Sequence, residues 1–360
     1  FQAEDGIRDS VASRGLGDVY KRQALFVIVL NGCFILGGGV SQKDGKQKGQ
    51  LVGAPDRDGF EMAAQYGMVK IPTGKFYMGE ADENIQLDQS NRNRQVTISA
   101  FYMDDTEITN DEYRQFIQYI EENPDFELSE GTTIESLKPD TTVWSSDFTN
   151  HYGDPLLAYY WSHPAFDDYP VVGVSWKQAV AFTKWRTQEM NKFLRANDQQ
   201  ATPDFRLPTE SEWEYAARGG FEGWRYPWGD KEPDGNQANC ADKNVDQGLR
   251  QQDKTWTWAD ISVDDGYEFA APVGSYPPNG YGLYDMAGNA YEWCQDWYDE
   301  NYYSVSPAKN PSGPTSSPQG WRVLRGGSWF NITSDLWLAS RNHETPAHRG
   351  CNLGFRCVSG

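Results

Sequence analysis

Residues 272–293, PVGSYPPNGYGLYDMAGNAYEW, form the stretch of sequence that decides the fold. They are mostly Gly, Asn, Asp, Pro and aromatic residues, and they show neither the period of a helix nor the alternation of a strand. The same composition prevails from Gly219 to the C-terminus. Buried backbone N–H and C=O groups must find partners. Because this stretch lacks the regular backbone hydrogen bonds of helices and sheets, aromatic packing and side-chain hydrogen bonds, or bound ions, have to stabilise it. The sequence therefore predicts a loop-rich fold that is held together by the packing of aromatic side chains.

Upstream of this stretch, three helix starts carry the same signal. Thr109 to Glu112, Ser175 to Gln178 and Thr209 to Glu212 all fit S/T-x-x-E/Q, in which the hydroxyl and the acidic or amide side chain satisfy orphan N–H groups. Each start opens an amphipathic stretch with apolar residues at helical spacing. We expect these apolar side chains in the core: Tyr113, Phe116, Ile117 and Ile120; Ala179, Phe182 and Trp185; Trp213, Ala216 and Ala217.

Two stretches near the beginning of the domain have the alternation of strands. Residues 66–78 alternate around a Pro-Thr-Gly turn, and residues 95–103 alternate Val96, Ile98 and Ala100 with polar positions. The aromatic-rich pattern then continues from about residue 60 to the end, which favours one large domain.

Composition argues against two classes of protein. Lys and Arg number 32 against 52 Asp and Glu, a net charge of -20, so the attraction to phosphate that nucleic-acid binding requires is missing. No apolar run approaches the ~20 residues of a spanning helix, which argues against a polytopic membrane protein.

The N-terminal residues divide into three segments before the domain. Residues 1–23 lack any periodicity, and we expect them to be non-native, adapter-derived sequence. Residues 24–32 have the short apolar core of a signal peptide, and Leu30-Asn31-Gly32-Cys33 resembles a bacterial lipobox, which predicts lipidation of Cys33. An ordinary signal peptide with an incidental cysteine is the alternative. Residues 33–60, polar and rich in Gly and Lys, would then be a lipid-anchored tether, and residues 61–360 the domain.

Several motifs carry a family resemblance. FRLPTESEWEYAARGG, PVGSYPPNGYGLYDMAGNAYEW, RVLRGGSWFN and NLGFRC occur in the order of the formylglycine-generating-enzyme (sulfatase-modifying-factor) domain, and the chain resembles this family over residues 66–358. The resemblance implies a single large α+β domain, the formylglycine-generating-enzyme fold, which is related to C-type lectins, has little regular secondary structure and is often stabilised by calcium.

Within that family, KGQLVGAPDRDGF (residues 48–60) and TEITNDEYRQF (residues 106–116) are most similar to the gliding-motility and type IX secretion lipoproteins GldK and PorK, with GldJ a close competitor. This resemblance implies a non-catalytic scaffold that is lipid-anchored in the outer membrane and faces the periplasm. Its partners would be GldN/PorN-like proteins of the secretion ring and further copies of itself, with no nucleic acid.

The cysteines decide between scaffold and enzyme. The oxidase that the chain resembles binds copper(I) through two closely spaced thiolates after the GGS motif, because soft sulfur ligands suit this ion. Here no cysteine lies between Ser328 and Gly350, and Asn331 stands at the first ligand's offset. An amide cannot replace a thiolate for copper(I), so we expect no copper and no catalytic residue. The alternatives are a sulfatase-maturation oxidase or related modifying enzyme, and a lectin-like surface binder.

Calcium is the ion that the sequence still accommodates. Two carboxylates and intervening carbonyls on a Gly-containing turn suit a hard cation. The resemblance implies a first site made by Asp285, Gly288, Ala290 and Glu292, and a less secure second site made by Asn239, Cys240, Asp265 and Tyr267. The role of calcium would be structural. Alternatively, Asp285 and Glu292 could cap the turn through backbone N–H groups.

Two further expectations concern pairing within the core. Arg206 and Arg356 could form bidentate pairs with carboxylates such as Glu210 or Glu214. In an oxidising periplasm one disulfide involving Cys357 is expected, with three complete pairings open to the four cysteines of the domain: Cys240, Cys294, Cys351 and Cys357.

Overall fold

The computed structural model describes residues 67–80, 92–126, 132–146, 155–240, 265–267 and 269–360. The chain divides into a unit that ends at Tyr66 and a unit from Gly67 to Gly360. The expected adapter, signal and tether segments, with Cys33, lie outside the described residues. Among the helices that are described, none is long and apolar enough to cross a membrane.

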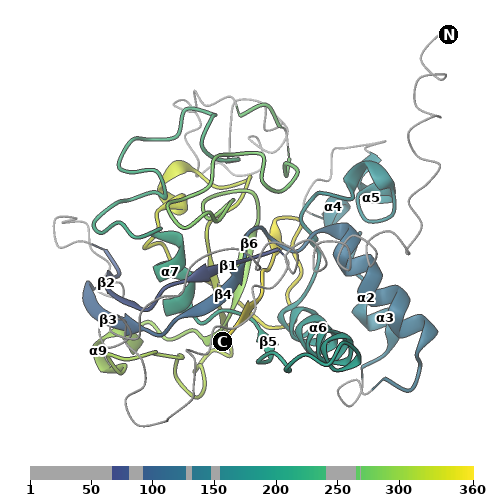
Figure 1. Cartoon of the computed structure of the whole chain (residues 1–360). Helices are drawn as coiled ribbons and strands as arrows, with labels where there is room; N and C mark the ends of the chain where they lie inside the picture. Colours follow the sequence, from purple (N-terminus) through teal and green to yellow (C-terminus); the bar gives the residue numbers. More distant parts are fainter. Residues whose placement is uncertain (1–66, 81–91, 127–131, 147–154, 241–264, 268) are drawn as a thin grey trace, which may run out of the picture. The chain divides into compact units, whose positions relative to one another are not determined.

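In the described part of the unit from Gly67, short strands form three separate sheets. Figure 1 shows the strands β1 to β6. The first sheet has the order β1-β4-β10-β5 and consists of β1 (Met68–Ile71), β4 (Phe101–Asp104), β10 (Val358–Ser359) and β5 (Phe205–Arg206). The second pairs β2 (Gly74–Met78) with β3 (Arg94–Ile98). The third has the order β8-β7-β6-β9 and consists of β8 (Asn342–Glu344), β7 (Arg322–Arg325), β6 (Tyr291–Trp297) and β9 (Leu353–Gly354).

Both stretches predicted as strands are split between sheets. The strands around the turn at Pro72 form no hairpin with each other, because β1 pairs with β4 and β2 pairs with β3. Residues 95–103 make two strands, β3 and β4, and Ala100 between them is exposed. The apolar residues of β3 and β4 reach the core in different sheets, so the chain has to turn at residues 99–100. The strand β6, which lies within the loop-rich half, was not predicted.

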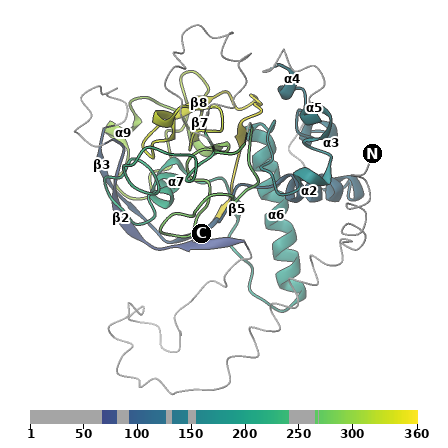
Figure 2. The same cartoon turned by 90° about the horizontal axis from the view of Figure 1, so that it is seen from above.

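The three predicted helices are confirmed. They are α2 (Asn110–Glu122), α6 (Trp176–Ala196) and α7 (Glu210–Ala217), and each begins directly after the N-cap residue of its predicted capping box. Helices α2 and α6 contact each other and lie side by side in both views (Figures 1 and 2). The remaining helical turns are short: α3 (Ile134–Leu137), α4 (Val143–Ser146), α5 (Pro155–Tyr159), α9 (Tyr302–Val305), and the 3-10 turns η3 (Pro164–Phe166) and η5 (Thr333–Leu336).

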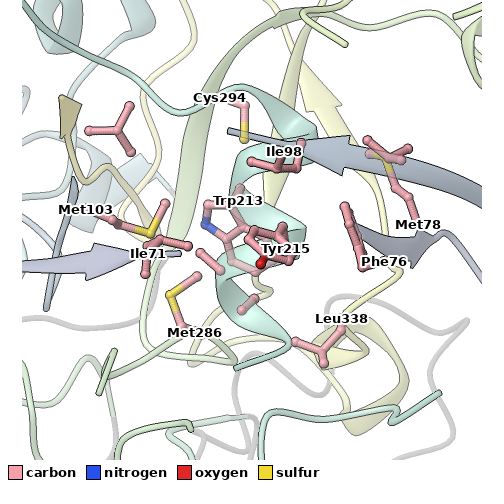
Figure 3. Packing of buried hydrophobic residues seen from close by; sticks show 14 of the residues in the cluster. Ile71, Phe76, Met78, Ile98, Met103, Trp213, Tyr215, Met286, Cys294 and Leu338 are labelled. Atoms are coloured by element: carbon pink, nitrogen blue, oxygen red, sulfur yellow. The ribbon is translucent and has the colours of Figure 1, made fainter. Parts of the chain in front are cut away.

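Helix α7 is the centre of the core. It contacts β2, β3, β6 and β7, and seven of its eight residues are buried. Figure 3 shows Trp213 and Tyr215 of α7 surrounded by Ile71, Phe76 and Ile98 from the strands. Because the helix is enclosed on all sides, its acidic residues Glu210 and Glu214 are buried together with its rings.

Buried arginines balance these carboxylates, but not in the predicted pairs. Arg206 pairs with Glu212 at 2.6 Å, and Arg356 pairs with Glu292 at 2.7 Å. Glu210 binds Arg341 at 2.6 Å, and Glu214 binds Arg218 at 2.7 Å as well as Arg325. Both arginines do form the predicted bidentate pairs with carboxylates, and only the partners differ. Residues 210 and 214 lie four apart on one helix face, whereas Glu212 lies at the capped start, beside Arg206.

The exposure of these pairs predicts very different contributions to stability. Arg356→Met would leave Glu292 as a buried charge without a counter-ion, so we expect the free energy of unfolding to fall by about 3–5 kcal/mol. Arg206→Met removes a pair that is 29% and 13% exposed, and we expect a loss below about 1 kcal/mol. Urea unfolding of the two variants measures the difference, and equal losses would contradict it.

Candidate functional site

The segment after β7 occupies the position where the resemblance places copper ligands. Gly326 and Gly327 both have positive φ, at 96° and 72°, and a Cβ atom on Gly327 would lie 3.0 Å from Leu336. The two glycines therefore allow a tight turn that no residue with a side chain could make without strain. The turn presents Ser328 and Asn331 to the same polar network.

This network consists of oxygen and nitrogen atoms. Asn331 accepts a hydrogen bond from the Ser328 hydroxyl through Oδ1 and donates to Asp335 through Nδ2 at 2.9 Å. Asn352 donates to the Ser328 hydroxyl at 3.0 Å. Burial raises the pKa of the neighbouring Tyr291 phenol to about 12, so it stays neutral near pH 7. Every one of these groups is a hard donor or acceptor, which does not suit copper(I).

The four cysteines that the structure describes are buried thiols without a disulfide. Each belongs to a different core cluster: Cys294 around α7, Cys357 with Phe355 and Phe182, Cys351 with Trp329 and Trp144, and Cys240 with Tyr226 and Leu336. The predicted disulfide involving Cys357 is therefore wrong. Its thiol is enclosed by α6 and the first sheet, and the other three sulfur atoms lie in separate parts of the core.

The first predicted calcium site is brought together around the turn that precedes β6. Asp285 adopts φ 56°, and its Oδ2 accepts a hydrogen bond from Gly274 N at 2.6 Å. This bond joins the turn to a segment eleven residues earlier, so it is not the capping of the turn itself that the sequence offered as the alternative. Glu292 has its carboxylate engaged by Arg356 at 2.7–2.9 Å and by the Trp213 indole at 2.8 Å. Gly288 and Ala290 are buried in the same turn.

The second predicted site is also assembled. Asp265 accepts hydrogen bonds from Cys240 N at 2.9 Å and Tyr267 N at 3.0 Å, and Asn239 donates to Phe269 O at 2.9 Å. The Oδ1 atom of Asn239 is buried and accepts no hydrogen bond. A hard cation would satisfy this oxygen, so these residues fit calcium. Bound there, calcium would link the segments around residues 239 and 265.

The two sites are neighbours because of one glycine. Asn289 N donates to Asn239 O at 2.9 Å, and a Cβ atom on Gly288 would lie 2.0 Å from that same carbonyl oxygen. Only glycine allows the two turns to touch this closely. Among the described residues, no group of three or more His, Cys, Asp or Glu side chains has a metal-binding arrangement. Backbone and amide oxygens would therefore have to contribute to either calcium site.

One acidic residue near the first site was missed by the sequence analysis. Glu107 directly precedes the Ile108-Thr109 start of α2, yet its side chain is only 1% exposed. Nothing in the local sequence indicates burial, because a single glutamate before a capping box is equally typical of an exposed loop. Neighbours far along the chain bury it.

Comparison with known proteins identifies relatives of this chain. Residues 56–360 match the Sulfatase-modifying factor enzyme 1-like domain. The formylglycine-generating enzyme of Streptomyces coelicolor is 34% identical over 308 residues, which cover 81% of this chain and 89% of the relative. The inactive C-alpha-formylglycine-generating enzyme 2 of Bos taurus is 33% identical, covering 81% and 88%. The solved structure of PvdO from Pseudomonas aeruginosa superposes with a TM-score of 0.55 at 23% identity, covering 81% and 93%, and supports the fold alone.

Burial of the thiols predicts their reactivity. Burial raises the pKa of both Cys294 and Cys357, which further lowers the fraction of reactive thiolate. In a Cys33→Ser variant under native, non-reducing conditions, we expect a thiol reagent to label none of the remaining four cysteines, and to label all four in guanidinium chloride. Fewer than four labelled thiols in the denatured protein would indicate a disulfide and contradict the structure.

Proposed function

Because this chain belongs to the Sulfatase-modifying factor enzyme 1-like domain family, we propose that it is a non-catalytic member that uses the enzyme fold as a rigid surface for binding proteins. The observation that carries this proposal is the environment of Asn331. An amide bonded to Ser328 and Asp335 stands where the oxidase needs a soft ligand. Cys351 and Cys357 are both buried and belong to different core clusters, which argues against a copper-binding pair of thiols.

A formylglycine-generating oxidase, or a related modifying enzyme, is the alternative function. It is favoured by the names of the relatives from Streptomyces coelicolor and Mus musculus, which are 34% and 35% identical to this chain. The relative from Bos taurus that is named inactive is similarly close, at 33% identity. Identity at this level does not separate the two functions, so the side chains after the GGS motif carry the distinction.

The finer proposal is a lipid-anchored scaffold of the gliding-motility and type IX secretion ring in the outer membrane. It is supported by the lipobox-like sequence before Cys33 and by the resemblance of residues 48–60 and 106–116 to the GldK and PorK lipoproteins. The partners would be GldN/PorN-like proteins and further copies of the chain. A net charge of -20 suits a protein-binding surface better than contact with anionic lipid headgroups. The relation to C-type lectins also stays a prediction.

An oxidation assay tests the non-catalytic proposal. The purified protein is incubated with copper(I), oxygen and a cysteine-containing peptide taken from a sulfatase, and the product is analysed by mass spectrometry. We expect no conversion of cysteine to formylglycine, because no thiolate pair is available to hold the metal. The Streptomyces coelicolor enzyme serves as the positive control, and aldehyde formation by this chain would refute the proposal.

Recovery of the protein from membranes tests the finer proposal. We expect the protein to be found in the outer-membrane fraction with ring components, and a Cys33→Ser variant to be released into the soluble fraction. Cross-linking followed by mass spectrometry identifies the partners. Recovery without any secretion-system protein would contradict the ring assignment while leaving the non-catalytic proposal standing.

A further inference from the structure

The strand β2 is an edge strand with one open side. It pairs with β3 in an unbroken antiparallel register from Gly74 to Met78, and no other strand of the described residues pairs with it. The ribbon of β2 and β3 lies at the rim of the unit from Gly67 in both views (Figures 1 and 2). Backbone N–H and C=O groups on an open strand edge can pair with another extended chain.

The hydrogen bonds of β3 show which residues of β2 point to the open side. Thr97 N donates to Ala308 O at 2.8 Å, and Asn310 N donates to Thr97 O at 2.9 Å, so both main-chain groups of Thr97 point away from β2. Lys75 lies directly opposite Thr97 in a pair without mutual hydrogen bonds, so its own N–H and C=O point to the open side. Those of Tyr77, two residues further along the strand, do the same. Among the described residues, no main-chain hydrogen bond from another segment reaches Lys75 or Tyr77 on that side.

The open edge is short, because both of its ends are closed. At one end, Gly79 N donates to Glu214 at 2.9 Å, and Gly79 O accepts a hydrogen bond from Arg218 at 3.1 Å. At the other end, Pro72 has no N–H, and its carbonyl accepts a hydrogen bond from the Tyr215 hydroxyl at 3.0 Å. The N–H donors and C=O acceptors between these ends match an extended segment of about five residues.

The exposed face of this ribbon is positively charged, although the chain has a net charge of -20. The segments that form it, β2, β3 and residues 308–310, contain no Asp or Glu. Lys309 is paired with Thr97, which in turn is paired with Lys75. The two exposed lysines therefore share one face with the ring of Tyr77, which is 47% exposed. Two positive charges on one face favour an occupant with negative charge.

A second copy of the chain fits this edge poorly. Pairing two β2 edges would bring two positive ribbons side by side, and it would join two chains that each have a net charge of -20. A lysine on an edge strand also discourages pairing with basic strands. An acidic strand replaces this repulsion with attraction.

We propose that the open edge of β2 binds an extended, acidic segment of a partner protein by strand addition. This inference rests on the proposed function as a protein-binding surface, and it names the surface and the chemistry of the partner. The partner residues opposite Lys75 and Tyr77 lie two positions apart, because the side chains of a strand alternate between its faces. An acidic side chain opposite Lys75 and an apolar one opposite Tyr77 predict the pattern apolar-x-acidic in an antiparallel partner strand.

Binding of a synthetic peptide to the full chain tests the proposal. The probe is the nonapeptide Ser-Thr-Phe-Thr-Glu-Thr-Val-Thr-Ser, whose Phe and Glu have the predicted spacing, and binding is measured by fluorescence anisotropy. For wild type we expect a dissociation constant below about 1 mM, and for Lys75→Glu binding that is about ten-fold weaker. Lys70→Glu makes the same change of charge at an exposed position of β1, in another sheet, and should bind the probe like wild type.

Two altered peptides separate strand addition from simple charge attraction. Lys in place of the Glu reverses the charge and should abolish binding. An N-methyl group on the backbone of the Glu keeps its charge but removes the N–H that would bind Lys75 O, so strand addition predicts about ten-fold weaker binding. These comparisons need no substituted protein, so they decide the question even if Lys75→Glu fails to fold.

Hydrogen exchange locates the bound peptide. In the complex, exchange of the Lys75 and Tyr77 amides should slow about ten-fold, because both become hydrogen-bonded. The Phe76 amide already faces β3 and should change little.

Three results would overturn the proposal. One is no binding of the acidic probe, or equal binding of the probe and its lysine version. Another is a bound probe that leaves exchange of the Lys75 and Tyr77 amides unchanged. The third is a free chain in which these two amides are already protected, because a second copy or another segment of the chain would then occupy the edge. None of these results affects the non-catalytic proposal, which the oxidation assay decides separately.

Discussion

The ion pair between Glu292 and Arg356 is the interaction on which the rest of the structure depends. Both side chains are fully buried. Glu292 lies on β6 and also accepts a hydrogen bond from Trp213 of α7, while Arg356 donates to the carbonyls of Asp104, Asp105 and Tyr284. One pair thus joins the central helix, the end of β4, the loop before β6 and the C-terminal segment. In a loop-rich chain, such side-chain bonds take the place of the missing ladders.

Buried charge has two consequences for this fold. A carboxylate that is removed from water needs a fixed partner, so each arginine position specifies a single arrangement of the loops around it. Glu214 illustrates this, because Arg218 of its own helix and Arg325 of β7 bind it together. Glu107 and Asp285 are also buried, and burial raises the pKa of both carboxyl groups, which favours their neutral forms.

The same physical chemistry underlies the proposal that this chain is not an oxidase. A copper(I) site needs polarizable sulfur, whereas the turn after the GGS motif is closed by hydrogen bonds among Ser328, Asn331 and Asp335. The fold of the family is retained because the packing around α7 and the Glu292–Arg356 pair maintain it. The proposed role in binding proteins requires only this retained fold.

The sequence by itself determined the features that depend on neighbouring residues. The starts of α2, α6 and α7 were predicted because a capping box involves residues three apart, and the family was recognised from motifs that are each local. Tertiary structure decided that β1 and β4 belong to one sheet and β2 and β3 to another. It also decided which carboxylates bind Arg206 and Arg356, how the four thiols are separated, and that Glu107 is buried. These features join residues far apart in the chain, as Glu292 and Arg356 do, so their partners are chosen by packing, which local sequence patterns do not encode.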